Sequence, residues 1–255
     1  MRLKFSEYPA KYEDYRFPYK VWALEDSPAE RDELLDMGFL PSRMKIGLWY
    51  LARSMRVDLA DFTESSENRR VTKNTAEYGF NVSDSLPSLR DEENAWVFEF
   101  AKSVAKGSDY SETSVKRVFS KHLSQRVFTW ERDGEIVGYV PLMVTEKAIF
   151  YWLAFYKEDK FATGLGSRMM LEAIKWAKDE GKTHAYLGTV YTNSSLYKTN
   201  FKGWEFFDGF GWSGDKEKLK YMIGKDRYDD SPELLMDKEF RKRFYNDRLR
   251  EMVGE

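Results

Sequence analysis

The pattern of apolar and polar positions predicts a chain in which helices and strands alternate. Ser27 and Pro28 suit a helix start, and Gly38 suits the left-handed residue that often follows a helix. Apolar and polar residues then alternate over 45–59, which predicts strands. The stretch 61–74 is polar and basic, so we expect an exposed loop there.

The middle of the chain has a clearer pattern. Apolar residues at helical spacing predict helices over 90–106 and 111–123. Strands are predicted at 126–131, 135–144 and 148–156, and an Asp-Gly turn joins the first two. The third strand is apolar on both faces, which is typical of a central strand covered on both sides.

A glycine-containing turn opens the next part of the chain. Gly164 and Gly166 precede an apolar helix that ends before Gly181. After it we expect a buried strand over 184–190, a helix carrying Tyr197, an aromatic strand over 204–212 and a charged helix over 232–252. Glycines at a helix start let a ligand approach the backbone, and the free amide groups and the helix dipole favour an anion.

The amino-acid composition limits the kinds of reaction and binding site that this protein can have. The 255 residues are 42% hydrophobic and 16% aromatic, which indicates a folded protein. There is no cysteine and there are two histidines, so disulfides, thiolate catalysis and thiolate metal sites are excluded and no metal centre is expected. The net charge of −2 gives no overall attraction to nucleic acid. No apolar stretch approaches the ~20 residues of a membrane span or resembles a signal peptide, so the cytoplasm is the expected location.

The order of elements from Gly164 to Trp212 resembles acyltransferases of the GNAT type. The resemblance implies an α/β fold, with a mixed central sheet flanked by helices over 86–225. An N-terminal α+β extension over 1–85 precedes this domain, and a charged helix over 226–255 follows it. In GNAT enzymes the glycine turn holds the pyrophosphate of acyl-CoA, and Tyr197 stands where a general acid is often placed. Phe161 takes the place of the usual Arg or Gln before that turn, which disfavours acyl-CoA.

Several motifs resemble, more specifically, the arginyl-tRNA–protein transferases and their leucyl-transferring bacterial relatives. They are the Leu165-Gly166 helix start, the Tyr186-Leu187-Gly188 strand end, the set Leu196, Tyr197, Lys198, Phe201 and Glu205, and the run FTESSENRRV over 62–71. Members of that family usually carry an N-terminal cysteine cluster. This chain has the segment 38–56 in its place, so its substrate selectivity is left open.

The resemblance implies transfer of an aminoacyl group from charged tRNA to the N-terminal amine of a protein or peptide, with no bound cofactor. The candidate catalytic residues are Tyr197, as the acid for the leaving oxygen, and Glu205, which alternates poorly with its aromatic neighbours. The candidate residues for binding the donor or the substrate are Gly164, Gly166, Ser167, Arg168, Lys198, Arg69, Arg70 and Lys73.

Two alternative functions stay open. The glycine turn and Asn193 to Tyr197 favour an N-acetyltransferase that uses acetyl-CoA. A catalytically silent GNAT-like module would instead use its basic residues to bind RNA or a peptide. The transferred amino acid, the accepting residue and the oligomeric state are not predicted.

Overall fold

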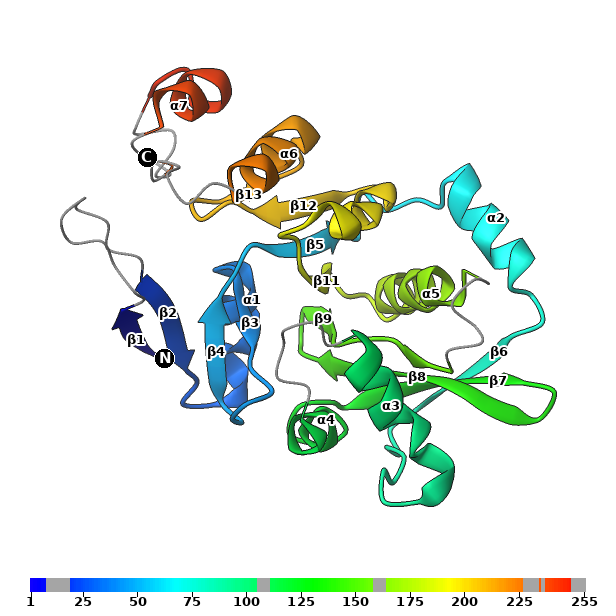
Figure 1. Cartoon of the computed structure of the whole chain (residues 1–255). Helices are drawn as coiled ribbons and strands as arrows, with labels where there is room; N and C mark the ends of the chain where they lie inside the picture. Colours follow the sequence, from blue (N-terminus) through cyan, green and yellow to red (C-terminus); the bar gives the residue numbers. More distant parts are fainter. Residues whose placement is uncertain (8–18, 105–110, 158–163, 227–233, 235–236, 249–255) are drawn as a thin grey trace.

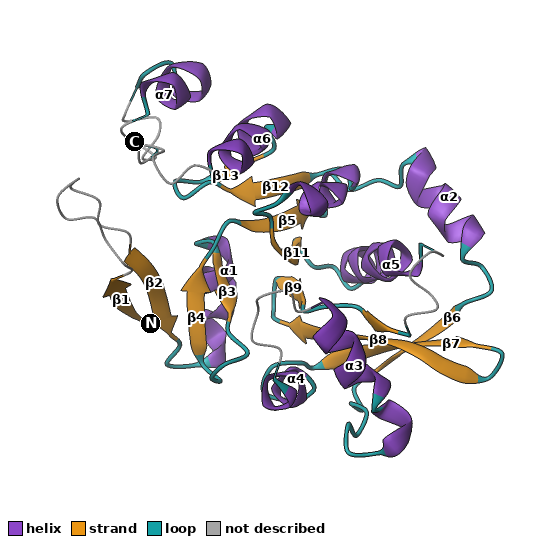
Figure 2. Ribbon diagram, viewed as in Figure 1, coloured by secondary structure: helices purple, strands orange, loops and turns teal. Residues whose placement is uncertain are grey.

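Two β-sheets organise the chain, and the larger one carries most of the helices (Figures 1 and 2). The computed structural model describes residues 1–7, 19–104, 111–157, 164–226, 234 and 237–248. The helices and strands below all lie in these ranges.

The N-terminal sheet has four strands in the order β1-β2-β4-β3. These are β1 (Arg2–Glu7), β2 (Tyr19–Leu24), β3 (Phe39–Pro41) and β4 (Leu48–Leu51), and each pairing is antiparallel. The predicted helix after Ser27 is present as a short 3-10 turn, η2 (Pro28–Glu30), followed by α1 (Arg31–Asp36). Gly38 follows it with a positive φ of 85°, as predicted for the end of a helix.

The second sheet has nine strands, in the order β13-β12-β5-β11-β9-β8-β7-β6 with β10 paired to β8. Its strands are β5 (Ser54–Asp58), β6 (Gly79–Ser83), β7 (Arg126–Arg132), β8 (Glu135–Val144), β9 (Ala148–Tyr151), β10 (Phe155–Tyr156), β11 (His184–Thr189), β12 (Trp204–Phe207) and β13 (Trp212–Ser213). β9 and β11 pair in parallel, whereas the other pairings are antiparallel. The predicted mixed sheet is therefore confirmed, and β9 lies inside it as expected.

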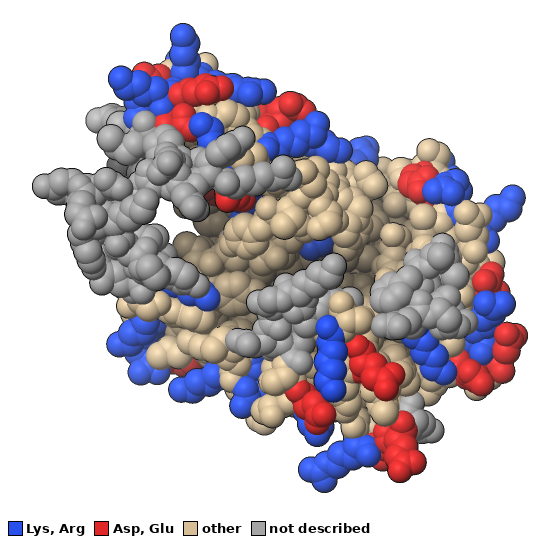
Figure 3. All heavy atoms as spheres, viewed as in Figure 1, with Lys and Arg blue, Asp and Glu red and all other residues tan. Residues whose placement is uncertain are grey.

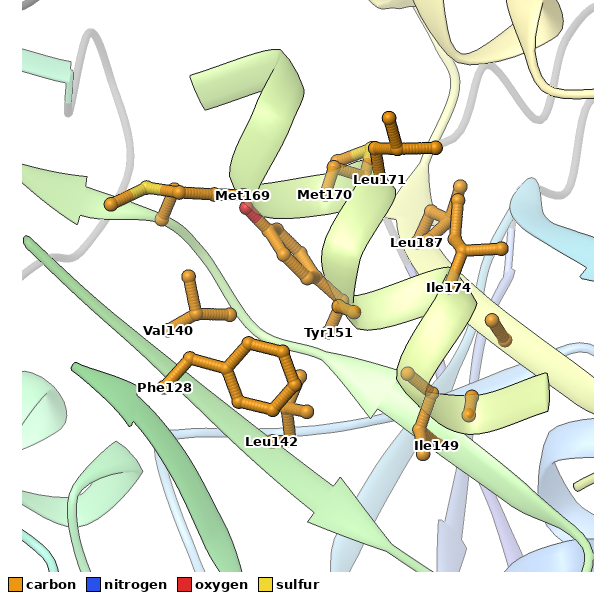
Figure 4. Close-up of a cluster of buried hydrophobic side chains, with 14 of the residues drawn as sticks. Phe128, Val140, Leu142, Ile149, Tyr151, Met169, Met170, Leu171, Ile174 and Leu187 are labelled. Carbon is orange, nitrogen blue, oxygen red and sulfur yellow. The ribbon is translucent and has the colours of Figure 1, made fainter. Parts of the chain in front are cut away.

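Helices cover both faces of this sheet (Figure 1). They are α2 (Ser66–Asn74), η3 (Glu92–Asn94), α3 (Trp96–Val104), α4 (Glu112–Val118), α5 (Leu165–Asp179), η5 (Asn193–Asn200), α6 (Lys216–Lys225) and α7 (Lys238–Tyr245). Consecutive residues of β7 show the two faces. Phe128 packs in the cluster under α5, and Val127 packs with α3 and α4. Figure 4 shows the first cluster, in which Tyr151 of the sheet lies beside Met170 of α5, and Phe128 lies beside Val140 and Leu142.

Two sequence predictions need correction. The segment 61–74 is not a loop throughout, because α2 begins at Ser66. Ser65 and Asn68 form a reciprocal capping box, with hydrogen bonds of 2.9 and 3.1 Å, that satisfies amide groups at the helix start. The predicted strand 148–156 is interrupted after Tyr151, where the chain leaves β11 and pairs with β8.

The predicted division of the chain at residue 85 stays a prediction. β5 and β6 precede that position, and both are strands of the nine-stranded sheet. The predicted tail helix is present as α7, and the remainder of 232–252 lies largely outside the described residues. Within the described ranges, none of the helices is long and apolar enough to cross a membrane.

Candidate active site

The sheet opens where β9 and β11 separate. The two strands pair from His184 with Ala148 to Tyr186 with Phe150. Beyond this point the chain after β9 pairs with β8, while β11 bulges at Gly188, whose φ is 83°. A positive φ of this size suits glycine, so the sequence Tyr-Leu-Gly produces the bulge directly.

A pocket of about 370 Å³, here called the main pocket, lies at this opening between the two sheets. Its N-terminal wall consists of Lys20, Trp22, Tyr50 and the segment 40–44. Its other wall consists of 150–153, Met170, 187–189, Tyr197 and Lys198. Figure 3 shows that the centre of one face of the molecule is hollowed and mainly uncharged, with charged side chains towards the edges.

The charge of the main pocket is positive. Lys20, Arg43 and Lys198 line it, and no Asp or Glu is among the described residues that line it. The ring of Trp22 lies under the Lys20 ammonium, with 4.7 Å between Nζ and the ring centroid. Such a pocket favours a ligand that combines an anionic group with an apolar or aromatic part.

Lys198 is the most deeply buried of the three cations. Lys198 is only 9% exposed, and its Nζ donates a hydrogen bond of 2.9 Å to the carbonyl oxygen of Thr189. Burial penalises the charged form and lowers the pKa of Lys198 to about 8. A substantial fraction of this amine is therefore neutral at slightly alkaline pH.

Tyr197 precedes Lys198 and has the opposite shift. The residue is 43% exposed, but desolvation of its hydroxyl group, together with the nearby hydroxyl of Tyr156, raises the pKa of Tyr197 to about 12. Burial also raises the pKa of Tyr151 well above its ordinary value, with further contributions from Tyr197 and Tyr156. Tyr197 thus keeps its proton at physiological pH and is suited to donate it.

The predicted glycine turn is present at the start of α5, outside the main pocket. Gly164 is the N-cap with φ 81°. A Cβ atom on Gly166 would stand 3.0 Å from the hydroxyl oxygen of Tyr156 and 3.3 Å from its ring carbons. Tyr156 therefore packs against the side of the first turn of α5 at Gly166, and binding of the acyl-CoA pyrophosphate at this turn stays a prediction. Phe161 lies outside the described residues.

Ser167 and Arg168 have different surroundings. Ser167 lines a smaller pocket of about 50 Å³ that also has Tyr197 in its wall. Arg168 donates to Glu172 at 2.6 Å and to the carbonyl oxygen of Thr72 at 3.0 Å, so its guanidinium joins α5 to α2. These contacts show that Arg168 holds α5 against α2. Its predicted role in binding the donor stays a prediction.

The basic residues of α2 are exposed and do not line the main pocket. Arg70 pairs with Glu67 at 2.6 Å, and Arg69 donates to the carbonyl oxygen of Glu64 at 2.9 Å. Arg69, Arg70 and Lys73 therefore form an outer surface of α2, and their contact with tRNA stays a prediction.

Glu205 lies on β12 and is not part of the main pocket. Its carboxylate accepts a hydrogen bond of 2.9 Å from Nε of Arg56, which also donates to Asp36 at 2.7 Å. Arg56 is stacked over the ring of Trp212, 4.0 Å from the centroid. The geometry gives Glu205 a partner in this ion-pair cluster and adds no support to the predicted catalytic role.

The N-terminal wall of the pocket was missed by the sequence prediction. Trp22, Tyr50 and Arg43 come from strands and a connection far from Lys198 in sequence. The strand β2 was not predicted from the sequence, and neither was its pairing with β4. The segment 38–56 contributes residues 40–44 and Tyr50 to this wall.

No group of three or more His, Cys, Asp or Glu residues that could hold a metal ion occurs among the residues that the structure describes. The side chains that line the main pocket instead offer tyrosine hydroxyl groups, lysine amines and a guanidinium group.

Comparison with known proteins agrees with the fold. Residues 89–201, which include Tyr197 and Lys198, match the model of the acetyltransferase (GNAT) family. The chain is similar to an aspartate/glutamate leucyltransferase from Xanthomonas campestris pv. campestris, with 35% identity over 83 residues, 32% of this chain and 33% of the relative. A protein with the same description from Stenotrophomonas maltophilia is 31% identical over 90 residues, 34% of this chain and 36% of the relative. The matches thus span about a third of each relative.

Among solved structures, the chain is similar to the C-terminal domain of a putative lysylphosphatidylglycerol synthetase from Agrobacterium fabrum. The identity is 18% and the TM-score 0.43, with 71% of this chain and 57% of that chain covered. The chain has the GNAT fold, with a mixed sheet flanked by helices and an added N-terminal region.

Proposed function

We propose that this protein transfers an aminoacyl group from charged tRNA to the N-terminal amine of a protein or peptide. The observation that carries the proposal is the position of Tyr197 and Lys198 in a positively charged pocket where β9 and β11 separate. The partly similar aspartate/glutamate leucyltransferases make leucyl-tRNA the first donor to test. Their description also points to acceptors with an N-terminal Asp or Glu, and an acidic acceptor suits a pocket with this charge. Charged tRNA places the reaction in the cytoplasm.

The reaction requires little covalent assistance. An α-amino group has a pKa of about 8, so part of it is neutral near pH 7 and is ready to attack an ester carbonyl. The two sheets that enclose the pocket would hold the amine and the ester together and exclude water, which provides much of the rate. Tyr197 would donate its proton to the ribose oxygen as that oxygen leaves.

The residues around the α5 helix start favour this donor over acetyl-CoA. Phe161 stands where GNAT enzymes usually have Arg or Gln, and Tyr156 packs against Gly166. A tRNA-borne ester does not need that place, because its reactive end requires only a single adenosine and the acyl group within the pocket.

The test is transfer of radiolabelled amino acids from charged total tRNA to peptides that differ in their N-terminal residue. Acetyl-CoA is run in parallel as the competing donor. Label that passes from one aminoacyl-tRNA supports the proposal and identifies both specificities. Label that passes only from acetyl-CoA identifies an N-acetyltransferase instead. Binding of tRNA or peptide without transfer from either donor identifies a binding module.

A further inference from the structure

Two lysines are buried among the described residues, and their surroundings differ. Lys218 is 5% exposed and forms an ion pair with the buried carboxylate of Asp208 and a contact with the hydroxyl of Tyr245. This is the usual arrangement, because a buried charge needs a partner of opposite charge. Lys198 has a backbone carbonyl as its hydrogen-bond partner, at 2.9 Å. The contrast indicates that Lys198 is not placed for an ion pair.

The groups around Lys198 do not stabilise its positive charge. The ionisable side chains that line the main pocket come from both sheets and from η5, and those described are Lys20, Arg43, Tyr50, Tyr151 and Tyr197. Two of these side chains are cationic, and none of them is a carboxylate. Nζ of Lys198 also lies 3.8 Å from the position of a Cβ on Gly188, so it stands beside the bulge of β11. Its environment therefore raises the neutral fraction of this amine above that of a lysine in water.

A neutral amine at this position has a free electron pair. One N–H group is sufficient for the bond to the Thr189 carbonyl oxygen, and the lone pair remains available to a group in the pocket. Tyr197 is the residue directly before Lys198 in η5, and it lines the same pocket. Two neighbouring groups whose surroundings shift their pKa values in opposite directions commonly act as the base and the acid of one site.

We propose that Lys198 accepts the proton of the attacking amine while Tyr197 donates a proton to the leaving oxygen. The inference rests on the proposed function. As the nitrogen–carbon bond forms, one proton moves from the amine nitrogen to Nζ of Lys198. As the carbon–oxygen bond of the ester breaks, the ribose oxygen takes the hydroxyl proton of Tyr197. The Lys198 ammonium then returns a proton to the Tyr197 phenolate, directly or through water, so both groups are restored.

The test compares variants of position 198 in single-turnover transfer over a range of pH. The acceptor's attacking nitrogen is a weakly basic hydrazide that stays neutral, so its own titration does not contribute. Lys198→Arg keeps the positive charge, but a guanidinium does not release its proton in this range. Lys198→Met removes both charge and base. We expect both variants to lose about 100-fold to 10,000-fold in rate, the usual contribution of a general base.

A chemical rescue keeps the test valid if Lys198→Arg folds poorly. Because the chain has no cysteine, Lys198→Cys can be alkylated at one position with 2-bromoethylamine to give thialysine. The amine of thialysine is more acidic than that of lysine. We expect alkylation to restore most of the rate and to move the midpoint of the rate–pH profile to lower pH. Lys202→Cys, alkylated in the same way on an exposed part of the chain, is the matched control and should retain the wild-type profile.

The outcomes separate the inference from the proposed function. If the wild type transfers but Lys198→Arg keeps its rate, Lys198 supplies charge alone and the inference is overturned. Thialysine that restores the rate without moving the midpoint overturns it as well. If the wild type transfers from no aminoacyl-tRNA, the proposed function fails and this role fails with it.

Discussion

The hydroxyl oxygen of Tyr156 lies 3.0 Å from the position that a Cβ atom would take on Gly166. This contact packs Tyr156 against the side of the first turn of α5, and Phe161 replaces the Arg or Gln that usually precedes this turn in GNAT enzymes. We therefore expect acetyl-CoA to leave the thermal unfolding of the wild type unchanged. A true ligand at 100 times its Kd would stabilise the fold by about 2.7 kcal/mol.

Tyr156→Ala is the companion variant for this experiment. It removes the ring from α5 and leaves the helix start in place. A saturable shift in the Tm of the wild type with acetyl-CoA would contradict the expectation. It would favour the N-acetyltransferase function over transfer from tRNA. A shift in the variant alone would show that Tyr156 is what excludes the cofactor.

Removal of the Tyr197 hydroxyl should slow transfer without unfolding the protein. We expect Tyr197→Phe to reduce the single-turnover rate by about 100-fold to 10,000-fold, because a general acid contributes that much. The residue is 43% exposed, so the loss of one oxygen should change the Tm little.

The matched control is Tyr191→Phe. Tyr191 is 44% exposed, and its hydroxyl accepts a hydrogen bond of 2.8 Å from the backbone of Arg53 outside the main pocket. We expect this variant to lose about 1 kcal/mol of stability and to keep its rate of transfer. Equal rates for the two variants would remove the assignment of Tyr197 as the acid.

The bulge at Gly188 should matter for both stability and transfer. Its φ of 83° is strained for any other residue, and a Cβ there would lie 3.8 Å from Nζ of Lys198. We expect Gly188→Ala to cost about 1–2 kcal/mol of stability through the left-handed backbone. The strained backbone should also shift the Thr189 carbonyl that holds Lys198 and so lower the rate of transfer between about 10-fold and 100-fold.

Gly181→Ala separates these two effects. Gly181 has a φ of 70°, and a Cβ there would have nothing within 4 Å. The cost in stability should be similar to that of Gly188→Ala, whereas transfer should be unchanged. Unchanged transfer in Gly188→Ala would place the reaction away from the bulge.

Burial of Lys198 should make stability depend on pH in the alkaline range. The pKa of Lys198 is about 8 in the folded protein, against 10.5 for the unfolded chain. The unfolded state therefore binds the proton more tightly. Above pH 10.5 the low pKa of Lys198 does not reduce the stability of the fold, and the stability falls as the pH is lowered from 10.5 towards 8. At neutral pH the difference corresponds to about 3 kcal/mol.

Lys198→Met isolates this contribution in chemical denaturation. We expect the variant to be more stable than the wild type at neutral pH. Its advantage in the free energy of unfolding should shrink by about 2 kcal/mol between pH 7 and pH 10. An advantage that stays constant across this range would mean that Lys198 has an ordinary pKa.

Arg168 should stabilise the contact between α5 and α2. It pairs with Glu172, whose side chain is 7% exposed, at 2.6 Å. We expect Arg168→Ala to cost about 3 kcal/mol, because it leaves a buried carboxylate with a weaker partner. The double variant Arg168→Leu with Glu172→Leu should recover most of this loss. If Arg168→Ala instead keeps its stability and raises only the KM for the donor, the predicted binding role is correct.

Local sequence patterns were sufficient for several elements. The apolar helix after Gly164 is present as α5, and the strand that is apolar on both faces is β9, in the interior of the sheet. These predictions succeed because side-chain periodicity and turn chemistry act between neighbours in the chain. The segment 61–74 shows the limit, since its helix depends on a single capping box and on contacts with α5.

The sequence by itself determined the α/β class, the helix after the glycine turn and the adjacent positions of Tyr197 and Lys198. The tertiary structure alone decided that Trp22 and Tyr50 face those residues across one pocket. It also decided that Tyr156 packs against Gly166 of α5, and that Lys198 is buried without a carboxylate as its hydrogen-bond partner. The physical reason is that strand pairing and desolvation depend on which distant residues surround a group. A residue type and its neighbours in sequence do not specify those surroundings.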